Sequence, residues 1–271
     1  MAKKILVVPD VHGGIFWKEP VENYLNQVDR VVFLGDYLDP YWDANETCDM
    51  DFVLFNFMEI INLKQDNSEK IVLLKGNHDF HYTSKRIMEI ACASRCDITN
   101  WQIYNKIFND CDDYFKIAHV EKVKGLTYLF SHAGFTTYWI NKVNAKIWRM
   151  NDRDINVSRQ DFVDKVNMLE YDYEGQNMLA IIGKCRSLFG EKTGSVLWAD
   201  IYEHAMPKAP KAYGLNQVFQ VFGHTRLEED MILFDNLVLI DSQQCFMIDE
   251  DIEEKIITLR EYEERTYTIT P

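Results

Sequence analysis

Residues 5–14 read ILVVPDVHGG, which is a run of apolar side chains followed by Asp10, His12 and two glycines. An uninterrupted aliphatic run of this kind is typical of a strand that is buried on both faces of a sheet. In α/β sheets, ligands gather beyond the carboxyl ends of the strands. The segment therefore predicts a buried first strand that delivers an aspartate and a histidine to one edge of a sheet. The glycines allow the backbone to fold closely around that site.

The same pattern, an apolar run that ends in a polar turn, recurs along the chain, and each turn contains residues able to bind a metal ion. The segments are VVFLGDYLD (31–39), IVLLKGNHD (71–79), YLFSHAG (128–134) and VFQVFGHT (218–225). Helical patterns lie between them, at 21–28 and 51–63. Alternation of strand, turn and helix predicts an α/β fold.

Two later regions depart from this alternation. Residues 136–200 are aromatic, charged and helical in pattern, and we expect a helical insertion there that flanks the site. Residues 231–233, 237–240 and 255–259 have strand patterns, with Asp235 and Asn236 at a hairpin position, and we expect them to form a second sheet packed on the first.

Composition limits the possible classes of protein. The chain has 271 residues, of which 47% are hydrophobic, and this favours one domain over 1–271 that includes the insertion. The net charge of −14 disfavours stable binding to nucleic acid. The sequence contains no signal peptide pattern, no apolar run of the ~18–20 residues that span a membrane, and no Cys-x-x-Cys pair. We expect a cytoplasmic protein with reduced thiols.

The turn residues point to a particular metal chemistry. Aspartate and asparagine oxygens combined with histidine nitrogens suit manganese, iron or zinc, whereas oxygen ligands alone would favour magnesium or calcium. A carboxylate can bridge two such cations about 3.5–4 Å apart, and the pair can activate water and hold a phosphoryl oxygen. Each turn alone is an ordinary loop, but all of them in one order predict a dinuclear site.

In this order the motifs Asp-x-His-Gly, Gly-Asp-x-x-Asp, Gly-Asn-His-Asp, Ser-His-Ala-Gly and Gly-His-Thr resemble those of the calcineurin-like metallophosphoesterases. Within that superfamily they are most similar to the serine/threonine phosphoprotein phosphatases and the related bacterial diadenosine tetraphosphatases. Residues 196–200 (VLWAD) and 240–242 (IDS) also resemble stretches of this branch, and the resemblance spans 5 to about 245. It implies a four-layer α-β-β-α sandwich of two mixed sheets flanked by helices.

The resemblance also implies roles for individual residues. The second metal would share the bridging carboxylate of Asp36 with the first. His78 would protonate the leaving group, and Asp39 would hydrogen-bond His78, fix its tautomer and raise its pKa. A bridging hydroxide would attack phosphorus in line, without a phosphoenzyme. The implied metal ligands are Asp10, His12 and Asp36 for the first metal and Asn77, His132 and His224 for the second, with Asn77 also contacting substrate.

Three departures from the branch pattern bear on the substrate. Arg226 stands where nucleases of the superfamily have a final histidine, which argues against a DNA nuclease. Pro40 follows Asp39 where the phosphatases have a phosphate-binding arginine, so protein substrates are in doubt. Arg186 is either the second phosphate-binding arginine of the branch or a surface residue, and Tyr37, with Tyr41 and Trp42, either lines the substrate entrance or belongs to the core.

We therefore expect a metal-dependent phosphatase acting on a phosphoprotein or small phosphomonoester. The alternatives are a dinucleoside polyphosphate hydrolase and, from another class, a non-catalytic metal-binding interaction module. The presence of every expected ligand and of His78 argues against that last alternative. Manganese is the expected metal, with iron, zinc, nickel, cobalt or magnesium as alternatives. The sequence contains no readable code for the substrate or the oligomeric state.

Overall fold

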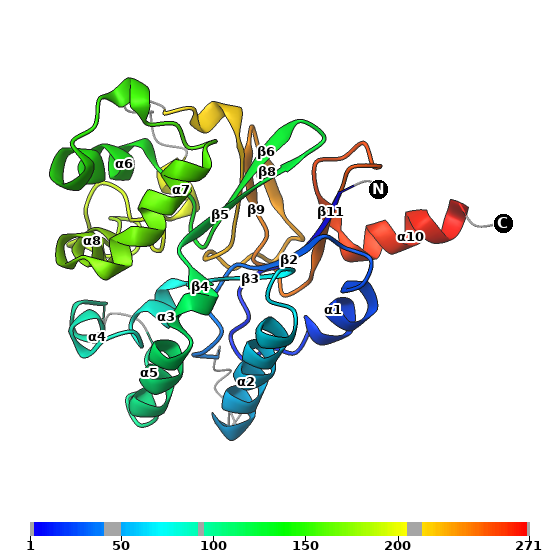
Figure 1. The fold of residues 1–271 in the computed structure, drawn as a ribbon, viewed down its shortest axis with the longest axis horizontal. Coiled ribbons are helices and arrows are strands. Elements are labelled where there is room, and N and C mark those ends of the chain that lie inside the picture. Colours follow the sequence, from blue (N-terminus) through cyan, green and yellow to red (C-terminus); the bar gives the residue numbers. More distant parts are fainter. Residues whose placement is uncertain (1–2, 41–49, 92–94, 205–212, 270–271) are drawn as a thin grey trace.

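The computed structural model describes residues 3–40, 50–91, 95–204 and 213–269. Within these residues the strands form two mixed sheets (Figure 1), with the orders β11-β10-β1-β2-β3-β4 and β5-β6-β7-β9-β8. The strands of the first sheet are β1 (Lys4–Val8), β2 (Arg30–Phe33), β3 (Ile71–Leu74), β4 (Phe115–Lys116), β10 (Phe246–Asp249) and β11 (Ile257–Thr258). Those of the second are β5 (Ala118–Val123), β6 (Leu126–Ser131), β7 (Phe219–Phe222), β8 (Ile232–Phe234) and β9 (Leu237–Leu239).

Strand register brings the carboxyl ends of the central strands to one level. β1, β2 and β3 are parallel, with Val8 opposite Phe33 and Phe33 opposite Leu73. In the second sheet β6, β7 and β9 are parallel, with Phe130 opposite Val221. The loops that follow these strands therefore leave the sheets at neighbouring points, as the sequence predicts.

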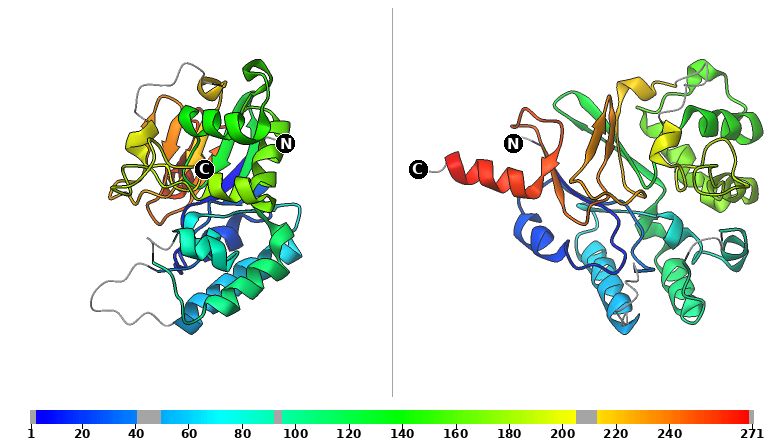
Figure 2. Two further views of the ribbon diagram at one scale, coloured as in Figure 1. Left: turned by 90° about the vertical axis from the view of Figure 1, so that its left-hand side faces the viewer. Right: turned by 180° about the vertical axis from the view of Figure 1, so that it is seen from behind.

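Helices cover the outer faces of both sheets. In Figures 1 and 2, α1, α2 and α5 lie together on one side of the first sheet, whereas α6, α7 and α8 gather beside the second. The helices are α1 (Lys18–Tyr24), α2 (Met50–Asp66), α3 (Asn77–Phe80), α4 (Lys85–Ala91), α5 (Trp101–Asp110), α6 (Thr137–Val143), α7 (Gln160–Asn167), α8 (Tyr173–Leu179), α9 (Ile201–His204) and α10 (Leu259–Ile269).

Alternation along the strands divides the apolar side chains among separate cores. In β1, Leu6 and Val8 pack with the helices of the first layer, whereas Ile5 and Val7 face the second sheet. On the far side of the second sheet, Leu129 of β6 packs with α6, α7 and α8. Helices, sheet, sheet and helices thus form the four-layer α-β-β-α sandwich.

The predicted C-terminal strands are partly wrong. Asp235 and Asn236 do form the hairpin between β8 and β9 in the second sheet. The predicted strand at 255–259 is instead the short β11, which pairs with β10 in the first sheet, and Leu259 already begins α10. β10 was not predicted at all, and it pairs antiparallel with β1.

The stretch 136–200 is helical, as expected. The Thr136 hydroxyl accepts from the Trp139 N–H at the start of α6, and the Asp172 carboxylate accepts from the Gly175 N–H at the start of α8, so both helices have side-chain caps. That this stretch is an insertion within a single domain stays a prediction. Among the cysteines described, Cys111, Cys185 and Cys245 have free thiols.

Candidate metal centre

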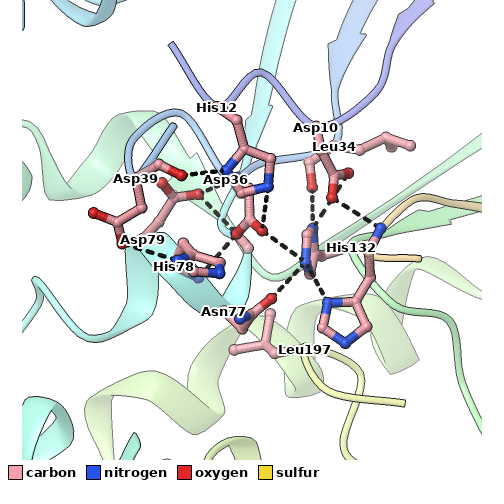
Figure 3. Close-up of polar contacts among 12 residues, drawn as sticks. Asp10, His12, Leu34, Asp36, Asp39, Asn77, His78, Asp79, His132 and Leu197 are labelled. Atoms are coloured by element: carbon pink, nitrogen blue, oxygen red, sulfur yellow. Dashed lines mark hydrogen bonds and ion pairs between the residues drawn. The ribbon is translucent and has the colours of Figure 1, made fainter. Parts of the chain in front are cut away.

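Loops from both sheets converge on one buried cluster of polar side chains (Figure 3). The loops after β1 and β2 run side by side, because the His12 N–H donates to the Asp36 carbonyl at 2.6 Å. In the second sheet the Gly223 N–H donates to the His132 carbonyl at 2.8 Å. The His224 N–H then donates to the Asp10 carboxylate at 2.9 Å and joins the two sheets. The fold thus brings all the predicted metal ligands together.

The first group of ligands is Asp10, His12 and Asp36, whose candidate donor atoms lie within 4.8 Å of one another. His12 Nδ1 lies 3.0 Å from the Leu38 carbonyl and 2.9 Å from the Asp39 carbonyl, so Nδ1 carries the proton. Nε2 is then an acceptor, and it lies 3.4 Å from Asp36 Oδ2. Two acceptors directed at each other in this way leave a place for a cation.

The second group contains His132, His224 and Asp36. His132 Nδ1 donates to the Leu34 carbonyl at 3.0 Å, which makes Nε2 an acceptor. This Nε2 lies 2.9 Å from Asn77 Oδ1, 3.1 Å from His224 Nδ1 and 3.5 Å from Asp36 Oδ2. A metal ion would satisfy such a convergence of atoms that can each act as a metal ligand.

Two buried atoms of these candidate ligands, Asp10 Oδ1 and His224 Nε2, have no hydrogen-bond partner among the residues that the structure describes. Buried polar atoms are nearly always satisfied, so each such atom calls for an explanation. The donor set of carboxylates, an amide oxygen and imidazoles matches manganese, iron or zinc. The residues present therefore fit a metal centre.

Burial gives these ligands unusual pKa values. It raises the pKa of Asp10 and of Asp36, and neighbouring carboxylates add to the effect. Burial lowers the pKa of His12 and His224, and lowers that of His132 to about 3. The imidazoles are therefore neutral at neutral pH, which is the form that binds metal. The clustered carboxylates repel one another, and a cation would relieve that repulsion.

The backbone adopts unusual conformations at three of the candidate ligands and at Asp39. His12, Asp36, Asp39 and His224 all have positive φ, between 45° and 70°, a region that non-glycine residues rarely adopt. Conformations of this kind cluster at functional sites, where each stores about 1–3 kcal/mol of strain. Gly76 belongs to the same arrangement, because a Cβ there would lie 2.0 Å from Asp36 Oδ1.

A second polar network lies beside the metal ligands and contains His78 and Asp39. His78 Nδ1 donates to Asp39 Oδ2 at 2.8 Å, as predicted, and the His78 ring lies 5.2 Å from the His12 ring. Asp39 raises the pKa of His78, as predicted, but the net shift of that pKa is downward. Burial lowers it, and this outweighs the opposing effect of Asp39. Burial alone would raise the pKa of Asp39, but hydrogen bonds from His78 and His81 hold it below its usual value.

Sequence reasoning missed three members of these networks. His81 Nε2 lies 2.8 Å from Asp39 Oδ2, and the Tyr82 hydroxyl also donates to this carboxylate. The spacing of His78 and His81 on one helical turn was an available signal. The Asp79 carboxylate accepts from the N–H groups of Asp36, at 2.6 Å, and Tyr37, at 2.9 Å, and so fixes the second loop. Its pKa is raised by burial to about 7.

The remaining predicted residues lie in different surroundings. Arg186 is at the edge of the site, where Nη2 lies 3.3 Å from the His224 carbonyl and Nε pairs with Asp200 at 2.8 Å. Of the two alternatives for Tyr37, the structure supports the core and contradicts a substrate contact, because the side chain has no exposed surface and its hydroxyl donates to the Leu74 carbonyl. Tyr41 and Trp42 lie outside the described residues.

Comparison with known proteins places the chain in a family. A family model for calcineurin-like phosphoesterases matches residues 3–225. The chain therefore belongs to the calcineurin-like phosphoesterase family, and it is a phosphoester hydrolase.

A solved structure with the same fold is a serine/threonine phosphatase from Saccharomyces cerevisiae, described as similar to human phosphatase PP5. It is 14% identical, with a TM-score of 0.53, and the match covers 94% of this chain and 78% of that one. At this identity the likeness shows the fold alone. No curated protein sequence matches the chain significantly. In the part of the chain that the structure describes, no helix is both long and apolar enough to cross a bilayer.

Proposed function

We propose that this phosphoesterase is a phosphatase with a dinuclear metal centre, acting on phosphomonoesters of a protein or a small molecule. The observation that carries the proposal is the position of Asp36. Its Oδ2 lies 3.4 Å from His12 Nε2 and 3.5 Å from His132 Nε2, between the two groups of acceptors. One carboxylate oxygen shared by two groups is what a bridging ligand requires.

Within this proposal, Asp10, His12 and Asp36 would hold one cation, and Asp36, Asn77, His132 and His224 would hold the other. Bound cations would supply Lewis-acid polarisation of the phosphoryl group and an activated water. Manganese is the metal we expect. Neutral imidazoles and a shared carboxylate leave the site able to bind transition metals over a range of ionic radii.

His78 serves as the general acid in the proposed reaction. Since Nδ1 donates to Asp39, the opposite nitrogen, Nε2, is the one that can give a proton to the leaving oxygen. Asp39 keeps its negative charge and holds the ring in this orientation. The lowered pKa of His78 makes the free imidazole mostly neutral near pH 7. A substrate dianion beside it would raise that pKa, because an opposite charge favours the imidazolium.

Arg186 has a role in substrate binding in this proposal, on the side of the site that contains His224. Its guanidinium lies beside the loop of His224 and is held there by Asp200. Planar guanidinium groups bind phosphoryl oxygens through directed N–H donors. We assign Arg186 to binding of the transferred phosphoryl group.

Hydrolysis of para-nitrophenyl phosphate by the chelated protein, before and after addition of Mn²⁺, tests the proposal. We expect activity only with metal, and its loss in Asp36→Asn and Asn77→Ala. His78→Ala should keep its metal and turn over ~10²–10⁴ times more slowly. A matched control is His119→Ala, because His119 lies on β5 and pairs with Glu121 at 3.0 Å.

Two outcomes would reject the proposal. One is the absence of turnover with every divalent metal tried, which would favour a non-catalytic binding module. The other is equal turnover in Asp36→Asn and the parent protein. If activity is present, a panel of phosphopeptides, phosphorylated metabolites and dinucleoside polyphosphates then identifies the substrate class.

A further inference from the structure

The loop after β2 has a proline, Pro40, at a position where a positively charged side chain could help to bind a phosphoryl group. Pro40 directly follows Asp39, whose carbonyl lies 2.9 Å from His12 Nδ1. A phosphoryl dianion held at the centre would be stabilised by positive charge on the His78 side as well as on the Arg186 side. Pro40 cannot supply that charge, so any such group must come from another segment of the chain.

Arg95 brings a guanidinium to this position from the segment after α4. Its Nη1 donates to the Pro40 carbonyl at 2.8 Å, and its own carbonyl lies 3.1 Å from His78 Nδ1. The two contacts are with the residue that follows Asp39 and with His78, the proposed general acid. Arg95 therefore lies beside the general acid, although it is far from the second loop in sequence.

Buried groups hold the backbone around Arg95 in place. The Asp97 N–H donates to the Tyr82 hydroxyl at 2.8 Å, and Tyr82 in turn donates to Asp39. The Trp101 indole N–H donates to the His81 carbonyl at 3.0 Å. The segment that carries Arg95 is thus fixed to the same network that orients His78. A group held in this way can bind substrate with little loss of conformational freedom.

Arg95 also borders open space. Arg95 lines a cavity of about 480 Å³ next to Asp39 and Pro40, with Met50 and Ile98 on its other walls. Electrostatics agree with this placement, because the charge of Arg95 contributes to lowering the pKa values of His12 and His78. Arg186 has the same effect on His132 and His224, at the opposite end of the site.

We propose that Arg95 binds a non-bridging oxygen of the substrate phosphoryl group, and so replaces from a distant segment the arginine that the second loop lacks. Arg95 and Arg186 then grip the phosphoryl group from the two ends of the metal centre. Arginine suits this role, because its planar fork of N–H donors can contact a carbonyl and an anion at once. The inference rests on the proposed phosphatase function, and it identifies a further substrate-binding residue.

Binding of inorganic phosphate to the Mn²⁺-loaded protein, measured by calorimetry, tests this inference without requiring turnover. Arg95→Ala should raise the Kd for phosphate about 10–100-fold, as expected when a charge-assisted hydrogen bond is lost. Arg95→Lys should recover part of the affinity, since it keeps the charge but not the fork. The metal content of each variant, measured separately, should stay the same.

Arg86→Ala is the matched control, because Arg86 donates to Gln176 at 2.8 Å and lies over the Tyr173 ring. It should leave phosphate affinity unchanged. A Kd for Arg95→Ala within twofold of the parent value, or equal losses in Arg86→Ala, would overturn the inference. So would an absence of phosphate binding by the parent protein. Turnover of para-nitrophenyl phosphate tests the proposed function separately, so the two failures can be distinguished.

Discussion

Lys75 is an unusual feature of this fold, because a lysine with a fully buried side chain sits directly before the Gly-Asn-His-Asp loop. Its Nζ pairs with Asp112 at 2.9 Å and with Glu170. The Glu170 side chain is only 5% exposed, whereas that of Asp112 is 40% exposed. Lys75 thus connects the end of β3, which leads to Asn77, with the helical stretch 136–200. We predict that Lys75→Met destabilises the protein strongly.

The magnitude follows from these exposures. Removing one partner of a buried ion pair costs about 3–5 kcal/mol, since the other charge is left unpaired. The pair with half-exposed Asp112 adds only about 0–1 kcal/mol, because solvent screens it. An unfolding entropy of about 2.1 cal/mol/K per residue makes 1 kcal/mol worth about 2 °C in a chain of this length. We therefore expect Tm to fall by about 6–10 °C.

Thermal and urea unfolding of metal-free protein provide the assay. The double variant Lys75→Met/Glu170→Leu removes both buried charges and should recover most of the loss. Lys106→Met breaks an exposed pair with Asp110 and should lower Tm by less than about 1 °C. The reasoning is refuted if Lys75→Met loses less than about 1 kcal/mol, or if the double variant is no more stable than the single one.

Three further predictions concern the metal centre. Gly76→Ala should weaken Mn²⁺ binding at least about tenfold, because the added Cβ would displace the Asp36 carboxylate. Gly125→Ala should leave Mn²⁺ binding unchanged, because the space around Gly125 is open, and equal Mn²⁺ affinities of the two variants by calorimetry would contradict the prediction. Mn²⁺ affinity should fall as the pH is lowered, because burial raises the pKa of Asp10 and Asp36 and the protonated carboxyls bind metal poorly, whereas the buried histidines stay neutral. An affinity that does not change with pH would count against these pKa directions. Asp39→Asn should lower kcat about 10–100-fold. It should also move the alkaline limb of the plot of kcat/KM against pH to lower pH, because Asp39 raises the pKa of His78. If that limb does not move, Asp39 does not set the pKa of the general acid.

The convergence of the candidate ligands could be predicted from the sequence, because each of them follows a short, strongly apolar strand. Such strands can lie only in a buried sheet, and parallel strands end at the same edge. The positions of β10 and β11 were harder to predict, because two to four residues carry little periodicity. In addition, β10 pairs with β1, which is more than 200 residues away in the sequence, and β11 pairs with β10.

The sequence also did not show the direction in which individual side chains point. Tyr37 lies between Asp36 and Asp39, but its ring turns into the core and stacks on Phe57, with ring centroids 5.5 Å apart. The pKa of His78 depends on how deeply the whole fold buries it, and no local pattern reports that quantity. Arg95 was overlooked for a similar reason, since only tertiary structure brings it to Pro40.

The central claim is that Asp36 bridges two metal ions. Anomalous X-ray scattering from crystals of the Mn²⁺-loaded protein tests it most directly. The account predicts two peaks about 3.5–4 Å apart, with Asp36 between them and His12 and His132 on opposite ions. A single peak, or two peaks that do not share Asp36, would contradict it.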